Sequence, residues 1–297
     1  MPRFIHLRPV GLWLSLLAAP LLGIGLSGPS YGQETALSVA MAPGLEADTA
    51  YAYADLVDLA LPANVVVRAQ VRKALWLKPE AAPGLPPGRA RLYIEARITA
   101  LLIGPELGES IRFLADVPLD ARGKPPRLNK TEVLVLARTV DESADELQLV
   151  APDAMLPLTP AREATLRAIL TETALPDAPP PITALREALH VSGNLAGEGE
   201  TQLFLATTTG APVSISVLRR PDQPVTWGVS FTEIVDSAAH PPLPSSLAWY
   251  RLACGLPQRL PERANISGSL VDRRIAAEDY ARVLADLGPC TRKRLAP

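Results

Sequence analysis

Arginine side chains recur at even spacings in two stretches of the first half of the chain. Arg68 and Arg72 stand in NVVVRAQVRK, and Arg91 and Arg97 stand in RARLYIEARITA. Between positions 62 and 140 there are thirteen basic and seven acidic side chains, which give a net charge of +6. Guanidinium groups pair with carboxylate, phosphate and sulfate, so a row of them on one surface suits a polyanionic ligand.

One aromatic ring, Tyr93, falls on the same face as these arginines. The candidate ligand contacts are therefore Arg68, Arg72, Arg91, Tyr93 and Arg97. Nucleic-acid binding normally uses several stacked aromatic rings, and the export predicted below separates the protein from most nucleic acid. The favoured partner is an anionic component of the cell envelope, such as a glycan or lipid head group, or an acidic patch on another protein. The alternative is a solvated face that only keeps the protein soluble.

Residues suited to catalysis or metal binding are sparse. His190 and His240 are the two histidines after the N-terminal segment, and both are expected at the surface or in loops. Ser237 and Asp236 stand near His240, but catalytic triads are not recognised by closeness in sequence. No Cys, His, Asp or Glu spacing matches a metal site, so no metal and no cofactor are expected. Two alternatives stay open: a periplasmic hydrolase of unknown type using residues scattered through the second half, and a structural or assembly factor.

The N-terminal segment has the layout of a signal peptide, predicted at residues 1–32. Two arginines precede an almost wholly apolar run from Val10 to Leu26, and Ser30 and Gly32 suit cleavage before Gln33. The protein is therefore expected to be exported to the periplasm and to have no membrane span after cleavage. The alternative is an uncleaved N-terminal anchor in the inner membrane.

The chain has two cysteines, Cys254 and Cys290. An even pair in an exported protein predicts one disulfide. The spacing fits neither a CxxC redox pair nor a metal knuckle. Because the first half has no cysteine, reduction is expected to destabilise the second half alone.

Three glycines, Gly193, Gly197 and Gly199, stand within seven residues of GNLAGEGETQLFLATTT. A phosphate-binding loop places such glycines between a strand and a helix. Here an alternating, strand-like segment follows them. They are therefore interpreted as the entry loop of a three-stranded antiparallel meander that extends to position 232. Two helices, at 245–255 and 275–288, close the chain.

Period-two alternation predicts five strands in the first half, because apolar residues at every second position give a strand one buried face. The strands fall in 64–73, 89–100, 109–117, 131–140 and 146–152, with helices at 53–63 and 159–174. This order favours a small closed sheet, an OB-like five-stranded β-barrel with flanking helices.

The strand pattern from NVVVRAQV to ESIRFL resembles netrin-like modules, the group that includes the tissue metalloproteinase inhibitors. The resemblance implies the fold alone, because those inhibitors act through an amino-terminal cysteine that this half lacks. The whole sequence also resembles a group of exported proteins of proteobacteria, and that resemblance implies no activity.

The prolines of LPDAPPP mark a linker between the two halves. The predicted fold class is α+β, with the barrel first and an antiparallel meander packed with helices second. The expected segments are a signal peptide at 1–32, an OB-like barrel domain at 50–173, a Pro-rich linker at 174–181, an α+β domain at 182–290 and a basic tail at 291–297. The expected function is that of a non-enzymatic exported binding protein of the cell envelope.

Overall fold

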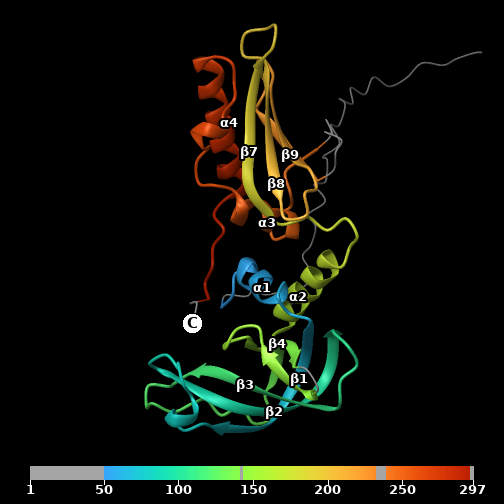
Figure 1. Ribbon diagram of the computed structural model, residues 1–297, viewed down its shortest axis with the longest axis vertical. Helices are drawn as coiled ribbons and strands as arrows, with labels where there is room; N and C mark the ends of the chain where they lie inside the picture. Colours follow the sequence, from blue (N-terminus) through green and yellow to red (C-terminus); the bar gives the residue numbers. More distant parts are fainter. Residues whose placement is uncertain (1–49, 141–142, 232–238, 295–297) are drawn as a thin grey trace, which may run out of the picture. The chain divides into compact units, whose positions relative to one another are not determined.

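The structure is a computed structural model that describes residues 50–140, 143–231 and 239–294 (Figure 1). The predicted signal peptide lies outside the described residues. The protein is α+β: a closed mixed β-barrel of five strands with flanking helices, and a separate antiparallel sheet of four strands. No helix in the described part of the chain is long and apolar enough to cross a membrane.

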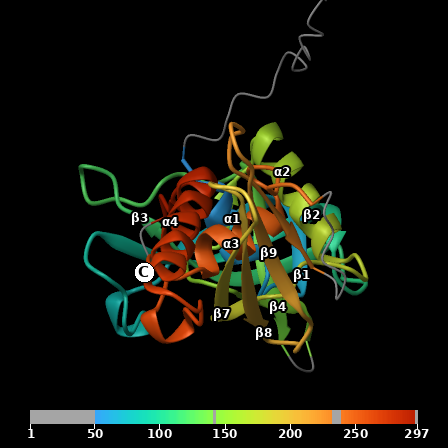
Figure 2. The ribbon, with the colours of Figure 1, turned by 90° about the horizontal axis from the view of Figure 1, so that it is seen from above.

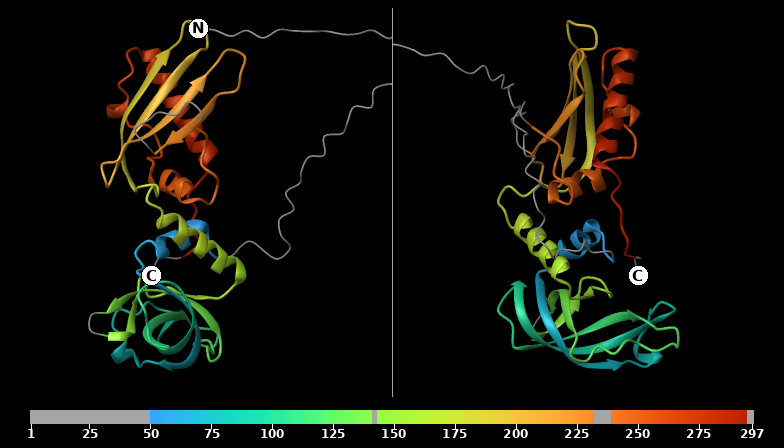
Figure 3. Two further views of the ribbon diagram at one scale, coloured as in Figure 1. Left: turned by 90° about the vertical axis from the view of Figure 1, so that its right-hand side faces the viewer. Right: turned by 180° about the vertical axis from the view of Figure 1, so that it is seen from behind.

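The barrel closes because β1 pairs with both β2 and β4. The strand order around the ring is β1-β2-β3-β5-β4, and the ring is visible in the left view of Figure 3. All neighbours are antiparallel except β3 and β5, which are parallel and share one residue pair, Arg112 and Glu146. A short sixth strand, β6 (Met155–Pro157), pairs with β4. The ring strands are β1 (Val65–Trp76), β2 (Arg89–Ile103), β3 (Ser110–Pro118), β4 (Glu132–Val140) and β5 (Ser143–Leu149).

The alternating pattern correctly identified the inward face of these strands. In β2, the apolar residues Ala90, Leu92, Ile94 and Ala96 are buried, while the residues between them are not. The apolar run Val133–Ala137 of β4 is buried along its whole length, as expected for a strand covered on both faces. Removal of these side chains from water is the main force that closes the barrel.

A bulge at Arg72 changes the alternation of β1. The register with β2 shifts between Val71 and Lys73, so two residues of β1 face one residue of β2 at this point. Beyond the bulge, Ala74 packs against the core, whereas Leu75 lies opposite Tyr93 on the outer side. Strict period-two alternation from Val65 would have placed Leu75 inside.

Two helices contribute apolar faces to the barrel core and contact each other. They are α1 (Tyr53–Ala60) and α2 (Pro160–Thr173). The hydroxyl of Thr159 accepts a hydrogen bond from the backbone of Arg162 and so caps α2, while Pro160 occupies the first turn. The predicted apolar stripe of α2 is buried; it comprises Leu166, Ile169 and Leu170. A single 3-10 turn, η1 (Pro79–Ala81), lies between β1 and β2.

The second sheet has four strands in the order β10-β9-β8-β7, one more than the predicted meander. They are β7 (Ile182–Ser192), β8 (Gly199–Thr207), β9 (Val213–Arg219) and β10 (Thr226–Ser230). Sequence reasoning missed β7 because two register shifts interrupt its alternation, so that Leu185, Ala188 and His190 are buried at uneven spacing. The glycine-rich segment is therefore the turn of the β7–β8 hairpin. Gly197 lies in that turn at a φ of +82°, a conformation that favours glycine.

Helices α3 (Leu247–Gly255) and α4 (Leu270–Leu287) pack on this sheet (Figure 2). Side chains of α4 such as Tyr280 and Val283 share a core with the inward residues of β8 and β9. The helix α4 begins five residues earlier than predicted, because Ser269 caps its first turn. The hydroxyl of Ser269 accepts a hydrogen bond from the backbone N–H of Asp272 and donates one to the carboxylate of the same residue. A 3-10 turn, η2 (Glu262–Ala264), precedes it.

Candidate binding surface on the barrel

The outer side of β1, β2 and β3 carries an exposed apolar row. Leu75, Tyr93 and Leu114 are successive cross-strand neighbours. Leu75 and Leu114 are each 46% exposed, and Tyr93 is half-buried between them. Three neighbouring apolar side chains on a wet sheet face offer a surface on which a ring or chain of a ligand can lie.

Two of the predicted contact arginines are engaged with protein groups. Arg91 forms a two-pronged pair with Asp116, with distances of 2.7 Å from Nε and 2.8 Å from Nη2 to the two carboxylate oxygens. Arg68 lies 3.5 Å from a carboxylate oxygen of Glu163 in α2 and donates to the hydroxyl of Thr99. Both guanidinium groups therefore brace the barrel.

The other two arginines, Arg72 and Arg97, are exposed and form no ion pair within the described residues. Arg97 lies opposite Gln70 of β1, close to the bulge that carries Arg72. They stand on the side of Lys73 away from the Leu75–Tyr93–Leu114 row. The surface formed by Arg72, Arg97 and this apolar row is called the β1–β3 surface below.

The basic excess read from the sequence is partly offset by local pairing. Lys73 lies 3.2 Å from Glu95 on the same surface, and Arg112 lies 2.7 Å from Asp145 of β5. The hydrogen bond from Arg112 holds the pKa of Asp145 below its usual range. An anionic ligand therefore meets two uncompensated arginines on this surface rather than a continuous basic field.

A cavity of about 500 Å³ adjoins the apolar row at the seam between β3 and β5. The two strands share one residue pair, so they separate beyond Arg112. Leu114 and Arg91 line this cavity from one side, and Leu147 and Leu149 line it from the other. The seam extends the β1–β3 surface into a groove.

His190 is buried, contrary to its expected place at the surface or in a loop. Its Nδ1 lies 2.8 Å from the hydroxyl of Thr201, and that hydroxyl donates to Asp279 of α4. Because the hydroxyl proton is directed to Asp279, Nδ1 of His190 acts as the donor to Thr201. Arg219 of β9 completes the network with Nη2 2.6 Å from Asp279. The imidazole also packs against Gly199, where a Cβ atom would lie 2.6 Å from Cε1.

This network joins β7, β8 and β9 to α4, and its three members His190, Thr201 and Asp279 are closed off from solvent. The exposed fractions are 3% for His190 and 0% for Thr201 and Asp279. His240, by contrast, is exposed, and its Nδ1 lies 2.9 Å from the carbonyl oxygen of Pro241. Ser237 and Asp236 lie outside the described residues. Within residues 50–140, 143–231 and 239–294, no three His, Cys, Asp or Glu side chains converge as a metal site would require.

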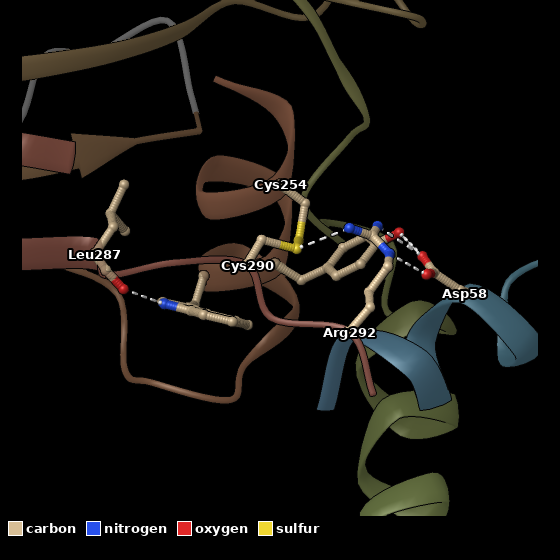
Figure 4. Close-up of a disulfide and its surroundings, with 7 residues drawn as sticks. Asp58, Cys254, Leu287, Cys290 and Arg292 are labelled. Carbon is tan, nitrogen blue, oxygen red and sulfur yellow. Dashed lines mark hydrogen bonds and ion pairs between the residues drawn. A yellow bond between two sulfur atoms is a disulfide. The ribbon is translucent and has the colours of Figure 1, made fainter. Parts of the chain in front are cut away.

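The predicted disulfide is present between Cys254 of α3 and Cys290, with the two Cα atoms 5.1 Å apart. The segment that follows Cys290 lies against α1 (Figure 4). Nε of Arg292 lies 2.6 Å from Asp58 of α1, and a second nitrogen of the same guanidinium donates to the sulfur of Cys290. We call residues 288–294 the C-terminal strap.

The carboxylate of Asp58 accepts hydrogen bonds from two side chains, Tyr250 and Arg292. The hydroxyl of Tyr250 in α3 donates to Oδ1 of Asp58 at 2.6 Å, and Nη2 of Arg292 donates to the same oxygen at 3.2 Å. Burial by itself would raise the pKa of Asp58, but the hydrogen bonds from Arg292 and Tyr250 outweigh it and lower that pKa. Burial and the neighbouring carboxylate raise the pKa of Tyr250 to about 12. This charged contact ties α1, α3 and the strap to one another.

Sequence reasoning thus named Tyr93, Arg72 and Arg97 but missed Leu75 and Leu114. Leu75 was hidden by the bulge at Arg72, which no period-two pattern reveals. The alternation of β3 does place Leu114 on the outer face, and its apolar side chain there was the available signal. Comparison of the chain with protein-family models gives no match, and comparison with curated proteins gives no relative in sequence.

Proposed function

We propose that this protein is a non-enzymatic, exported binding protein of the cell envelope, which holds an anionic partner on the β1–β3 surface of an OB-type barrel. The observation that carries the proposal is an exposed Leu75–Tyr93–Leu114 row on the same strands as Arg72 and Arg97, two arginines that form no ion pair in the part of the chain that the structure describes. The Lys73–Glu95 pair lies between the row and these arginines. Such a surface joins an apolar platform to a cation, as carbohydrate and polyanion binders do.

The strand order of the barrel supports the OB-type assignment. A five-stranded ring in the order β1-β2-β3-β5-β4, closed between β1 and β4, has the connectivity of a Greek-key barrel. In OB-type barrels the outer face of strands two and three is the usual ligand face. Tyr93 and Leu114 lie on that face here.

Export is supported by two independent features. The N-terminal residues have the layout of a signal peptide, and the disulfide between Cys254 and Cys290 is of the kind that persists in oxidising compartments. In the periplasm the available polyanions are envelope glycans, lipid head groups and acidic proteins. We therefore place the partner among these classes and not among nucleic acids.

The test is salt-dependent retention of the purified protein on a sulfated polysaccharide column. The variant carrying Arg72→Gln and Arg97→Gln should elute at clearly lower salt than the wild type, because each neutralised arginine removes one counterion-dependent contact. Tyr93→Ala should weaken retention without altering its salt slope, because a stacking contact carries no charge.

The matched control carries Arg122→Gln and Arg127→Gln, two exposed arginines of the β3–β4 loop. It loses the same charge elsewhere on the barrel and should retain wild-type elution. Arg91→Gln should instead lower the melting temperature, because it leaves the buried carboxylate of Asp116 without its partner. Equal retention of both double variants, or no retention of wild type at low salt, contradicts the proposal.

A further inference from the structure

A second cavity, of about 590 Å³, opens at one end of the barrel, and Asp116 stands between it and the groove at the β3–β5 seam. Its walls come from the ends of β2, β3, β4 and β6, from the β3–β4 loop, from the residues before α1 and from the strap. A volume in this range suits a small organic molecule. The cavity shares no residue with Arg72, Arg97 or the apolar row.

The floor of this cavity is apolar. Val117 and Val133 are core residues of the barrel, and Leu128 and Met155 pack against them. The ring of Tyr51 lines one side, with the guanidinium of Arg162 stacked 4.5 Å from its centroid. A ligand that fills this space must therefore have an apolar body.

Three carboxylates also line the cavity, and each has a cationic partner within the protein. Arg91 satisfies both oxygens of Asp116 from outside the cavity. The three pairs are Asp116 with Arg91, Asp153 with Arg294, and Glu132 with Arg68, at 2.7, 2.8 and 3.7 Å. Asp116 and Asp153 are therefore compensated without any ligand, whereas Glu132 shares Arg68 with Glu163.

Arg89 is a cation of the lining that lacks such a partner. Its Nη1 donates to the backbone carbonyl of Asp116 at 3.2 Å, and no ion pair involves it within the ranges that the structure describes. The other N–H groups of the guanidinium can therefore bind an anion. A carboxylate is a favoured partner because it matches the planar fork of donors.

The strap supplies a wall of the cavity and is itself fixed at several points. The backbone N–H of Lys293 donates to Asp55 at 2.9 Å, and Arg294 donates to Asp153 at 2.8 Å. The disulfide at Cys290 anchors the preceding residues. The wall is therefore held in place, and the cavity is formed before any ligand arrives.

We propose that this cavity is a second binding site, for a small amphipathic anion: an apolar chain or ring system that ends in a carboxylate. The apolar body lies on Val117, Val133 and Met155, and the carboxylate pairs with Arg89. This site goes beyond the polyanion surface proposed above, because its ligand is a single small molecule.

The test uses dodecanoate as the probe, titrated calorimetrically into the full mature protein below the micelle concentration. Dodecanol, with the same chain and no charge, is the matched ligand control. Dodecanoate should bind saturably, with one molecule per protein. Arg89→Gln should weaken its binding about tenfold or more, as expected for a charge-assisted hydrogen bond. Met155→Trp should abolish binding by filling the floor, and Arg122→Gln should leave it unchanged.

Absence of any heat of binding at millimolar dodecanoate overturns the proposal. The proposal is also overturned if the two single variants, Arg89→Gln and Met155→Trp, both bind dodecanoate with wild-type affinity. If the wild-type protein binds dodecanol as tightly as dodecanoate, the ligand need not be an anion and that part of the proposal is overturned. This comparison uses the wild-type protein alone, so it does not depend on whether a variant folds. The Arg72→Gln and Arg97→Gln double variant should keep dodecanoate binding while it loses retention on the polysaccharide column. Failure of either site can therefore be told from failure of the other.

Discussion

Removal of the disulfide tests how far the strap stabilises the molecule. The perturbation is the double variant Cys254→Ser and Cys290→Ser, or reduction of the wild-type protein. The two cysteines are 36 positions apart, and closing a loop of that length removes chain entropy worth about 4 kcal/mol in the simple model. For a chain of this size, that loss corresponds to a fall of about 8–15 °C in melting temperature.

The strap also determines which elements lose stability when the disulfide is reduced. The cysteine-free first half was expected to be indifferent to reduction. Instead, Arg292 contacts Asp58 of α1 and Arg294 contacts Asp153 beside the barrel. These contacts lie just beyond Cys290, so freeing that cysteine should loosen them too. Reduction should therefore increase hydrogen exchange in α1 as well as in α3.

The assay is differential scanning calorimetry of the purified protein with and without reductant, combined with hydrogen exchange followed by mass spectrometry. Reductant should have no effect on the double serine variant, which is the control for non-specific action. A fall in melting temperature of less than about 2 °C would refute the entropic argument. Unchanged exchange in α1 would refute the role of the strap, and two free thiols in wild-type protein purified without reductant would refute the disulfide itself.

Three further predictions concern single residues. Asp58→Asn should lower the free energy of unfolding at neutral pH, and its difference from the wild type should shrink as the pH falls below about 4. The reason is that a carboxylate whose pKa is lowered by folding contributes its full stability only above the ordinary carboxyl range. Equal differences at pH 7 and pH 2.5 in denaturant titrations would contradict this. Asp279→Asn should cost about 3–5 kcal/mol by breaking a buried pair, whereas Glu278→Gln on the exposed side of α4 should cost less than about 1 kcal/mol; similar urea midpoints would exclude the buried network as a stabilising element. Gly228→Ala should destabilise by about 1–3 kcal/mol, because its Cβ would lie 2.2 Å from the backbone carbonyl of Ala239; an unchanged melting temperature would show that this close approach is absent in solution.

The sequence by itself determined the strands and helices whose pattern depends on local chemistry. The alternation of Ala90, Leu92, Ile94 and Ala96 identified both a strand and its buried face, because side chains in a strand alternate between the two sides. The α+β class, the barrel and the antiparallel sheet followed from such runs. The disulfide followed from an even cysteine pair in a chain with a predicted signal peptide.

Local patterns failed where the backbone departs from regular geometry. The bulge at Arg72 inverted the faces of the residues after it, and register shifts in β7 concealed a whole strand. A bulge is selected by the pairing of two strands and by the core that they close, so neither strand alone encodes it in its polarity pattern. The exposed position of Leu75 was therefore hidden from the sequence.

The tertiary structure alone decided which charges find partners. Arg91 and Arg97 are equivalent in the sequence pattern, yet Arg91 is paired with Asp116 and Arg97 is not. The sequence predicted an exposed position for His190. In the structure His190 is buried, because α4 packs on the sheet and places Asp279 within hydrogen-bonding distance of Thr201. Ion pairs and cavities depend on distances of a few ångströms between residues far apart in the chain, and only the packing of the whole fold sets those distances.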